Sequence, residues 1–141
     1  MRFAAALHDV GKLSISSELL AKHDTPSGAE VLELRKHAAS GADLLMDEFD
    51  LEGCEWIAAH HERWDGFGYP FGLFGSDIPF GSRIIAVAET FDVLINESGW
   101  RNRLPEDAAL EELKRCAGTQ FDPEVVEAFL LVQPLIQPVI V

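Results

Sequence analysis

The chain has 141 residues, which is the length of one ordinary domain. Hydrophobic residues make up 48% of it, enough to build a core, so a disordered or collagen-like chain is excluded. Asp and Glu number 24 against 11 Lys and Arg, a formal net charge of −13. Such an acidic domain is excluded as a general binder of DNA or RNA polymers, although a small anion could bind where cations gather.

The ends of the chain and its two cysteines bear on location. Cys54 and Cys116 lie far apart and form no disulfide framework, so we interpret both as core residues of a protein in a reducing cytoplasm. The apolar start is stopped by His8-Asp9. The apolar tail carries polar residues and prolines and is shorter than the roughly 20 residues that span a bilayer. We expect a cytoplasmic domain without a membrane segment, of unspecified oligomeric state.

The first half of the chain predicts helices. An apolar run favours a first helix over about residues 2–10, which Gly11 ends. Ser27 and Glu30 fit a capping box, and the apolar spacing after them predicts one or two amphipathic helices. A further helix is expected over about residues 52–62, with its apolar side turned to the core.

Residues 63–81 break all periodicity. They are rich in glycine and aromatic residues and hold two prolines, which is typical of a long ordered loop with a function. The helical pattern resumes over residues 82–96 and again between Pro105 and Cys116. Asp122-Pro123 favours the start of a last helix. Since no alternating strand pattern occurs, we predict an all-α fold and one domain over residues 1–141.

Two pairs of adjacent residues carry candidate metal ligands. His8-Asp9 ends the first predicted helix, and His60-His61 ends another, just before the glycine-rich loop. Neither spacing matches a zinc finger or the H-E-x-x-H helix. For each histidine taken alone, a surface or satisfied core position is the alternative.

These pairs suit two metal ions better than one. Adjacent helical residues point about 100° apart, whereas two ions about 3.5–4 Å apart can divide the ligands between them. A carboxylate such as Asp9 can bridge two ions, with His8 on one and His60 and His61 divided between them. His37 faces inward on the apolar stripe of its helix. Histidine with carboxylate suits iron, manganese or another borderline divalent ion; scattered structural histidines remain the alternative.

Together these motifs resemble the HD-GYP domain family. The resemblance begins at His8-Asp9, continues through Lys36-His37 and ends at residues 117–123, with a highly specific central stretch that reads His60-His61-Glu62-Arg63-Trp64-Asp65-Gly66-Phe67-Gly68-Tyr69-Pro70. The family is helical, and its members are bacterial phosphodiesterases that hydrolyse cyclic di-GMP to pGpG or GMP. They use two or three metal ions, often iron or manganese. The resemblance implies an HD-type helical domain with one long ordered loop, the GYP loop, which is the segment 63–81 that contains Gly68-Tyr69-Pro70.

The resemblance also assigns residues. It implies two divalent ions, Fe or Mn, held by His8, Asp9, His37, His60, His61 and Glu89. Lys12 matches a lysine beside the scissile phosphate, and with Asp9 it is an expected catalytic residue in the attack of a bridging hydroxide on phosphorus. Substrate contacts are expected from Lys12, Arg101, Gly66, Gly68, Tyr69 and Pro70. Without the resemblance, Lys12 and Arg101 would be interpreted as solvated charges.

The sequence departs from the family pattern around this site. Only seven residues come before His8 in this sequence, so we expect the chain to lack the helix that precedes the HD pair and carries further ligands in the family. Glu89 stands where the family has Asp, and of an Arg-Pro-Tyr motif with a following basic residue only Arg101 remains. Ser16 and Ala38 replace prolines, which affects local shape.

Three functions are therefore considered. The first is a metal-dependent phosphodiesterase acting on a cyclic dinucleotide. The second is a catalytically impaired signalling module that contacts a signalling protein through the GYP loop; the missing helix and lost arginine favour it. The third is another HD phosphohydrolase acting on a mononucleotide, against which the GYP loop and His60-His61 argue.

Overall fold

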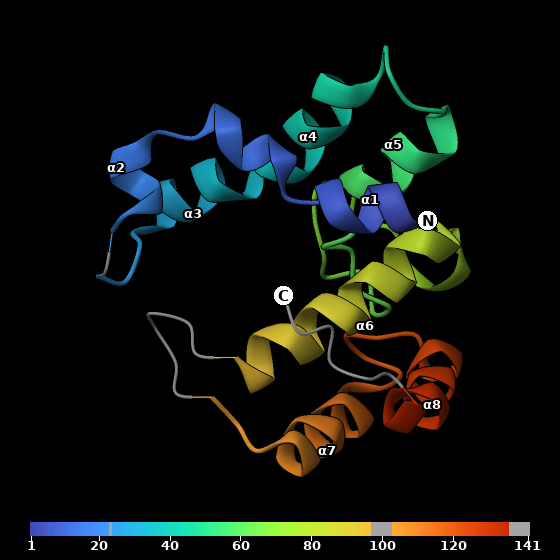
Figure 1. Cartoon of the computed structure of the whole chain (residues 1–141). Coiled ribbons are helices and arrows are strands. Elements are labelled where there is room, and N and C mark those ends of the chain that lie inside the picture. Colours follow the sequence, from blue (N-terminus) through green and yellow to red (C-terminus); the bar gives the residue numbers. More distant parts are fainter. Residues whose placement is uncertain (23, 97–102, 136–141) are drawn as a thin grey trace.

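The computed structural model describes residues 1–22, 24–96 and 103–135, and these residues form an all-helical fold, as predicted (Figure 1). The helices in chain order are α1 (Arg2–Leu7), the 3-10 helix η1 (Val10–Ser14), α2 (Ser17–Leu20), α3 (Gly28–Arg35), α4 (His37–Leu45), α5 (Leu51–Ala58), the 3-10 helix η2 (Gly75–Asp77), α6 (Phe80–Ile95), α7 (Glu106–Cys116), α8 (Pro123–Val132) and the 3-10 helix η3 (Gln133–Leu135). Within the described ranges, a single isolated bridge joins Ala117 to Phe121.

Polar side chains begin several helices where the sequence predicts them. The predicted capping box is present, because the Ser27 hydroxyl accepts from the Glu30 backbone N–H and the Glu30 carboxylate accepts from the Ser27 N–H. Asp122 caps α8 by accepting from the backbone N–H of Glu124, with Pro123 as the first helical residue. These contacts satisfy N–H groups of the first turn, which have no partner inside the helix.

Two helices end earlier than predicted. Helix α1 ends at Leu7 and α5 at Ala58, so His8-Asp9 and His60-His61 lie just beyond the helices rather than on their last turns. The Nδ1 atoms of His8 and His60 lie 2.7 and 2.6 Å from the carbonyl oxygens of Ala5 and Ile57. In a continuing helix those oxygens would accept from backbone N–H groups, so the imidazole rings help to end both helices.

Helix α6 joins the two parts of the fold. It contacts α5 on one side and α7 and α8 on the other (Figure 1). On the N-terminal side, α4 packs against η1 and α5, and α1 packs against α5. Helices α2 and α3 project from this part at the upper left of Figure 1. The loop between α5 and α6 therefore connects the N-terminal group of helices to the start of α6, the central helix.

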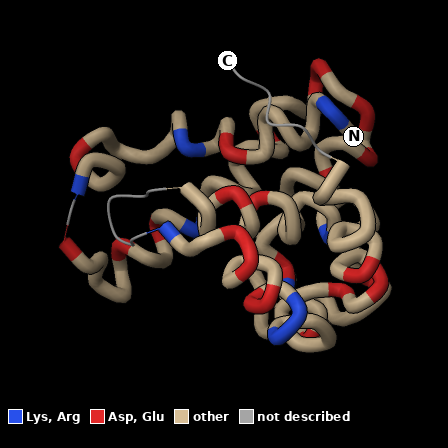
Figure 2. The backbone as a smooth tube through the Cα atoms, turned by 60° about the horizontal axis from the view of Figure 1, so that its bottom comes forward, with Lys and Arg blue, Asp and Glu red and all other residues tan. Residues whose placement is uncertain are grey.

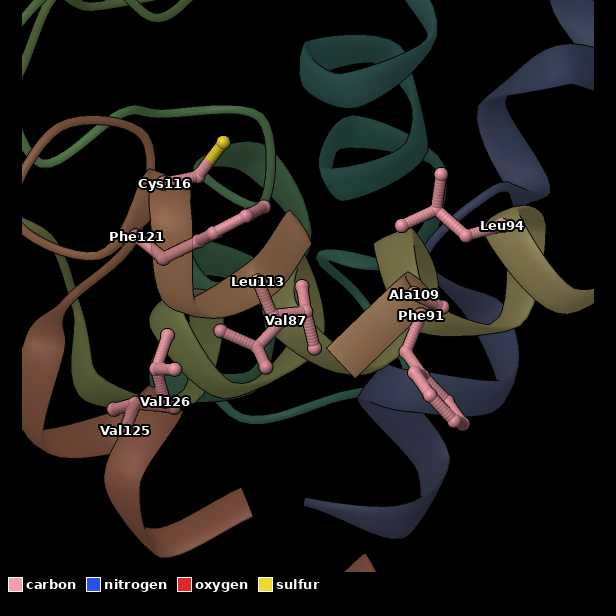
Figure 3. Packing of buried hydrophobic residues seen from close by; sticks show 9 residues of the cluster. All are labelled: Val87, Phe91, Leu94, Ala109, Leu113, Cys116, Phe121, Val125 and Val126. Carbon is pink, nitrogen blue, oxygen red and sulfur yellow. The ribbon is translucent and has the colours of Figure 1, made fainter. Parts of the chain in front are cut away.

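Two hydrophobic clusters hold these helices together. The larger one joins α6, α7 and α8 and contains the nine residues shown in Figure 3: Val87, Phe91, Leu94, Ala109, Leu113, Cys116, Phe121, Val125 and Val126. The second joins α1, α4, α5 and α6 through Ala4, Ala42, Cys54, Ile57, Ala58 and Ile85. Both cysteines are buried and unpaired, as predicted for core residues. Among the described residues, no helix is long and apolar enough to cross a bilayer.

Candidate metal centre

The six predicted ligands come from four separate segments and lie together. His8 and Asp9 follow α1, His37 begins α4, His60 and His61 follow α5, and Glu89 lies on α6. Ligand atoms within 4.8 Å of one another form two groups that share one histidine: His37 with His60 and His61, and His8 with Asp9, His60 and Glu89. The fold thus brings every predicted ligand into one pair of adjoining groups.

Gly11 allows the segment with Asp9 to lie directly against α4. A Cβ atom on Gly11 would lie 1.9 Å from the carbonyl oxygen of His37 and 2.5 Å from the backbone nitrogen of Gly41. No larger residue fits unless the backbone moves. This close approach places the Asp9 Oδ1 atom 3.4 Å from His37 Nε2.

Backbone carbonyl groups orient three of the imidazole rings. The Nδ1 atoms lie 2.6–2.7 Å from the carbonyl oxygens of residues three positions earlier, in the pairs His8–Ala5, His37–Leu34 and His60–Ile57. Because a carbonyl oxygen only accepts, each Nδ1 carries the proton and each Nε2 presents a lone pair to the centre. A metal-binding histidine is commonly held in this way by its other ring nitrogen.

The arrangement fits divalent cations. The Nε2 atoms of His37 and His60 lie 3.4 Å apart, and two lone pairs cannot bond to each other. Two nitrogen ligands about 2.1 Å from one tetrahedral ion lie about 3.4 Å apart, so a shared ion resolves this repulsion. The Oδ1 atom of Asp9 is buried without a hydrogen-bond partner in the described structure, which is costly for a carboxylate unless a cation compensates.

Asp9 turns one oxygen toward each group. Its Oδ1 faces His37, and its Oδ2 lies 3.5 Å from His8 Nε2 and 2.5 Å from Lys12 Nζ. Burial alone would raise the pKa of Asp9, but the hydrogen bond and the charge of Lys12 lower it overall. The carboxylate is therefore ionised at neutral pH, as a metal ligand must be.

Burial also affects the protonation of the remaining ligands. Burial lowers the pKa of His60 to about 4 and that of His61 to about 3, so both rings are neutral and available as ligands at neutral pH. Burial also raises the pKa of Glu89. Glu89 Oε1 lies 3.9 Å from His8 Nε2. The longer side chain at this position therefore still reaches the cluster.

A buried carboxylate, Glu62, anchors the GYP loop. Its Oε1 accepts from the backbone N–H groups of Phe71 and Gly72 at 2.6 and 3.1 Å, and its Oε2 accepts from Leu73 at 3.0 Å. Sequence reasoning did not single out this residue. The available signal was an acidic residue directly after two histidines at the end of a predicted core helix, because a buried carboxylate requires partners.

The predicted loop residues shape one edge of the centre. Gly66 has a φ of +79°, and a Cβ on Gly68 would lie 2.3 Å from the backbone nitrogen of Arg63. Both positions favour glycine. Tyr69 stacks on the ring of His61, with centroids 4.8 Å apart and planes at 26°, and Pro70 follows it through a cis peptide bond and is exposed. Tyr69 therefore lies beside a candidate ligand.

Two hollows open beside the candidate ligands. One of about 250 Å³ is lined by His60, His61 and Glu89 together with the side chains of Thr90, Gln120 and Phe121. The other, of about 350 Å³, is lined by His8, Asp9, Lys12 and Glu89. Glu89 borders both, so the centre faces open space on two sides. Arg101, the remaining predicted substrate contact, lies outside the described residues.

Comparisons with known proteins show which family the chain belongs to. A family model described as HD domain matches residues 1–125. A cyclic di-GMP phosphodiesterase of Thermotoga maritima is 38% identical over 133 residues, covering 92% of this chain and 36% of the relative. A 3'3'-cGAMP-specific phosphodiesterase of Vibrio cholerae is 38% identical over 129 residues, covering 91% and 28%. The chain thus spans about a third of the length of such relatives.

Solved structures share the fold. The crystal structure of a cyclic GMP-AMP-specific phosphodiesterase of V. cholerae superposes with a TM-score of 0.70 at 24% identity, covering 94% of this chain and 37% of that one. A protein of Bdellovibrio bacteriovorus described as HDG"Y"P gives the same TM-score and identity, covering 93% and 42%. The chain therefore belongs to the HD domain family, in the HD-GYP branch that its sequence motifs resemble.

Proposed function

We propose that this chain is a metal-dependent phosphodiesterase domain that hydrolyses a cyclic dinucleotide, with cyclic di-GMP as the expected substrate and pGpG or GMP as the product. The observation that carries the proposal is that the proton-free Nε2 atoms of His37 and His60 lie 3.4 Å apart, while the buried Oδ1 of Asp9 lies 3.4 Å from His37 Nε2 and has no hydrogen-bond partner among the described residues. The names of the relatives, which are phosphodiesterases of cyclic di-GMP or 3'3'-cGAMP, support the substrate class.

The proposal assigns two divalent ions, Fe or Mn, to the two groups of ligands. His37, His60 and His61 would hold one ion, and His8 with Glu89 would hold the other. Asp9 would contribute an oxygen to each. When bound, the ions supply an activated water near neutral pH and offset negative charge on the phosphoryl oxygens.

The chain's own residues prepare the site for this chemistry. The backbone carbonyls fix the rings of His8, His37 and His60 before substrate arrives, which lowers the cost of reorganisation. Lys12 lines the larger hollow with its ammonium beside Asp9. From there it would stabilise charge on a phosphate oxygen or donate a proton to the leaving oxygen.

The two hollows support a substrate with a nucleoside on each side of the scissile phosphate. One hollow lies beside His61 and the other beside Lys12, with Glu89 between them. A cyclic dinucleotide has this form, whereas a mononucleotide would leave one hollow empty. Gly66, Gly68, Tyr69 and Pro70 would border the substrate on the loop side, and Arg101 stays a predicted phosphate contact.

The test is metal analysis of protein purified without oxygen, paired with hydrolysis of cyclic di-GMP in added Fe(II) or Mn(II). We expect about two ions per chain and release of pGpG or GMP. Less than one ion per chain together with no turnover would contradict the proposal. A chelator-treated sample, reloaded with the same ion, controls for damage during preparation.

A second candidate is a signalling module that binds a protein partner through the GYP loop. The supporting observation is that the loop and the start of α6 expose four aromatic side chains: Phe67, Phe71, Phe74 and Phe80. Exposed apolar groups of this kind are typical of contact surfaces. Full metal content without hydrolysis of cyclic di-GMP would favour this candidate over the enzyme.

A further inference from the structure

Arg35 is a cation beside the metal centre that has no acidic partner in the described structure. It ends α3, is exposed, and places its guanidinium carbon 4.8 Å from the centre of the Tyr69 ring. Tyr69 in turn stacks on His61. The Arg35 charge and the candidate metal ligand His61 therefore both contact the ring of Tyr69, and no sequence motif pointed to Arg35.

Most other described cations already have an acidic partner. Ion pairs with Asp or Glu engage Lys12, Lys22, Lys36, Arg63, Arg83, Lys114 and Arg115. Acidic residues recur along the whole described tube in Figure 2, in keeping with the net charge of −13. Within that part of the chain, Arg35 is the cation at the centre's edge that forms no ion pair with a described carboxylate. Its charge is available to an anionic ligand.

The position of the guanidinium over the Tyr69 ring leaves its donors free for an anion. Arginine commonly stacks on an aromatic face, and in that arrangement its N–H donors point outward in the plane of the group. No hydrogen bond from these donors to a described residue occurs in the structure. Since a planar fork of N–H groups matches two phosphate oxygens, Tyr69 would hold Arg35 in an orientation that suits a phosphate.

We propose, building on the function proposed above, that Arg35 binds the second phosphate of a cyclic dinucleotide, the one that is not cleaved. Such a substrate carries two phosphates. The metal ions and Lys12 serve the phosphate that is hydrolysed, so the other phosphate meets an acidic protein unless a further cation receives it. Arg35 is that cation, and it acts as a substrate-binding residue rather than a group that takes part in bond breaking.

The test compares two substrates that differ in phosphate number. Cyclic di-GMP has two phosphates, and bis(p-nitrophenyl) phosphate has one. In the metal-loaded chain, Arg35→Ala should raise KM for cyclic di-GMP roughly 10- to 100-fold, the loss expected for a charged hydrogen-bonded contact, and leave kcat within about threefold. Hydrolysis of bis(p-nitrophenyl) phosphate should be unchanged. Arg35→Lys, which keeps the charge without the planar fork, should fall between wild type and Arg35→Ala.

Lys36→Ala is the matched control, because it removes the same charge from the next residue, whose ammonium is already paired with Glu33. It should change neither substrate's kinetics. Equal losses on both substrates in Arg35→Ala would overturn the proposal, since they would show that Arg35 only supports Tyr69. An unchanged KM for cyclic di-GMP would also overturn it.

The role of Arg35 can be tested even if the proposed hydrolysis of cyclic di-GMP is not found. If wild type holds metal but hydrolyses neither substrate, equilibrium binding of cyclic di-GMP replaces KM. A loss of about tenfold or more in affinity on Arg35→Ala, with none on Lys36→Ala, would still support the role of Arg35. Equal affinity in wild type and Arg35→Ala, or no binding by wild type, would overturn it.

Discussion

The orientation of single imidazole rings decides what the centre can bind. His37 and His60 each turn a proton-free Nε2 inward because a backbone carbonyl holds the opposite nitrogen. The resulting contact between lone pairs is unfavourable without a cation. Asp9 adds a buried oxygen that lacks a hydrogen-bond partner in the described structure. Buried polar groups without partners are costly in a protein core. We therefore interpret these side chains as a site prepared for a cation.

Replacing Asp9 tests that interpretation. Asp9→Asn keeps the size of the side chain but removes its charge and one acceptor oxygen. We expect loss of at least one ion per chain. Mutation of a residue that only hydrogen-bonds to a metal ligand lowers activity roughly 10- to 100-fold, and the loss of Asp9, a ligand itself, should lower it further. Metal analysis and hydrolysis of cyclic di-GMP measure both. Asp47→Asn, at an exposed position, is the charge-matched control; unchanged metal content in Asp9→Asn would refute the bridging role.

At the scale of elements, close packing of η1 on α4 and a fixed GYP loop position the ligands. Gly11 brings the segment of Asp9 against the start of α4. Glu62 fixes the loop through three backbone N–H groups, and the loop also bonds to the turn before α8, since Asp65 N–H donates to Thr119 O at 2.8 Å. The contacts of Gly11 and Asp65 join segments that are distant in sequence, whereas those of Glu62 lie within one loop.

Gly11→Ala should separate η1 from α4. Its methyl group would meet backbone atoms of His37 and Gly41, which cannot move aside as a side chain can. We expect the free energy of unfolding of the metal-free protein to fall by at least about 1–3 kcal/mol. Metal binding should also become weaker. Urea denaturation and metal titration measure the two effects. Gly28→Ala is the control, since nothing lies within 4 Å of its added Cβ; similar behaviour of the two variants would contradict this explanation.

Glu62→Gln tests the anchor of the loop. A glutamine has one acceptor oxygen, so its NH₂ group would face a backbone N–H that the carboxylate now satisfies. We expect about 1–3 kcal/mol of lost stability in urea denaturation, the cost of leaving a buried donor unpaired. Protease cleavage within residues 66–74 should become faster. Glu48→Gln, at an exposed site, should change neither, and the anchor role fails if Glu62→Gln behaves in the same way.

At the scale of the whole molecule, the sequence predicted much of the fold and indicated the candidate ligands that lie close together. Apolar periodicity and the caps at Ser27 and Asp122 indicated the helices, and the HD and GYP motifs indicated the ligands that the structure brings together. The predicted ends of α1 and α5 were wrong, because the His8 and His60 side chains contact the carbonyls of Ala5 and Ile57 and compete with helical hydrogen bonds.

Other features could not be predicted because they depend on tertiary contacts. Arg35 and Tyr69 meet only after α3 and the loop are placed beside each other, and neither shows a local pattern that signals the contact. The three N–H partners of Glu62 lie nine to eleven residues away along an irregular loop. Local periodicity contains no information about such pairs.

The central claim is that residues of four segments form one centre for two metal ions. X-ray diffraction from crystals loaded with Mn(II) or Fe(II), recorded at the absorption edge of the ion, tests it most directly. We predict two anomalous peaks, one among His37, His60 and His61 and one among His8, Asp9 and Glu89. Peaks located away from these side chains, or no ordered ion in protein that still hydrolyses cyclic di-GMP, would contradict it.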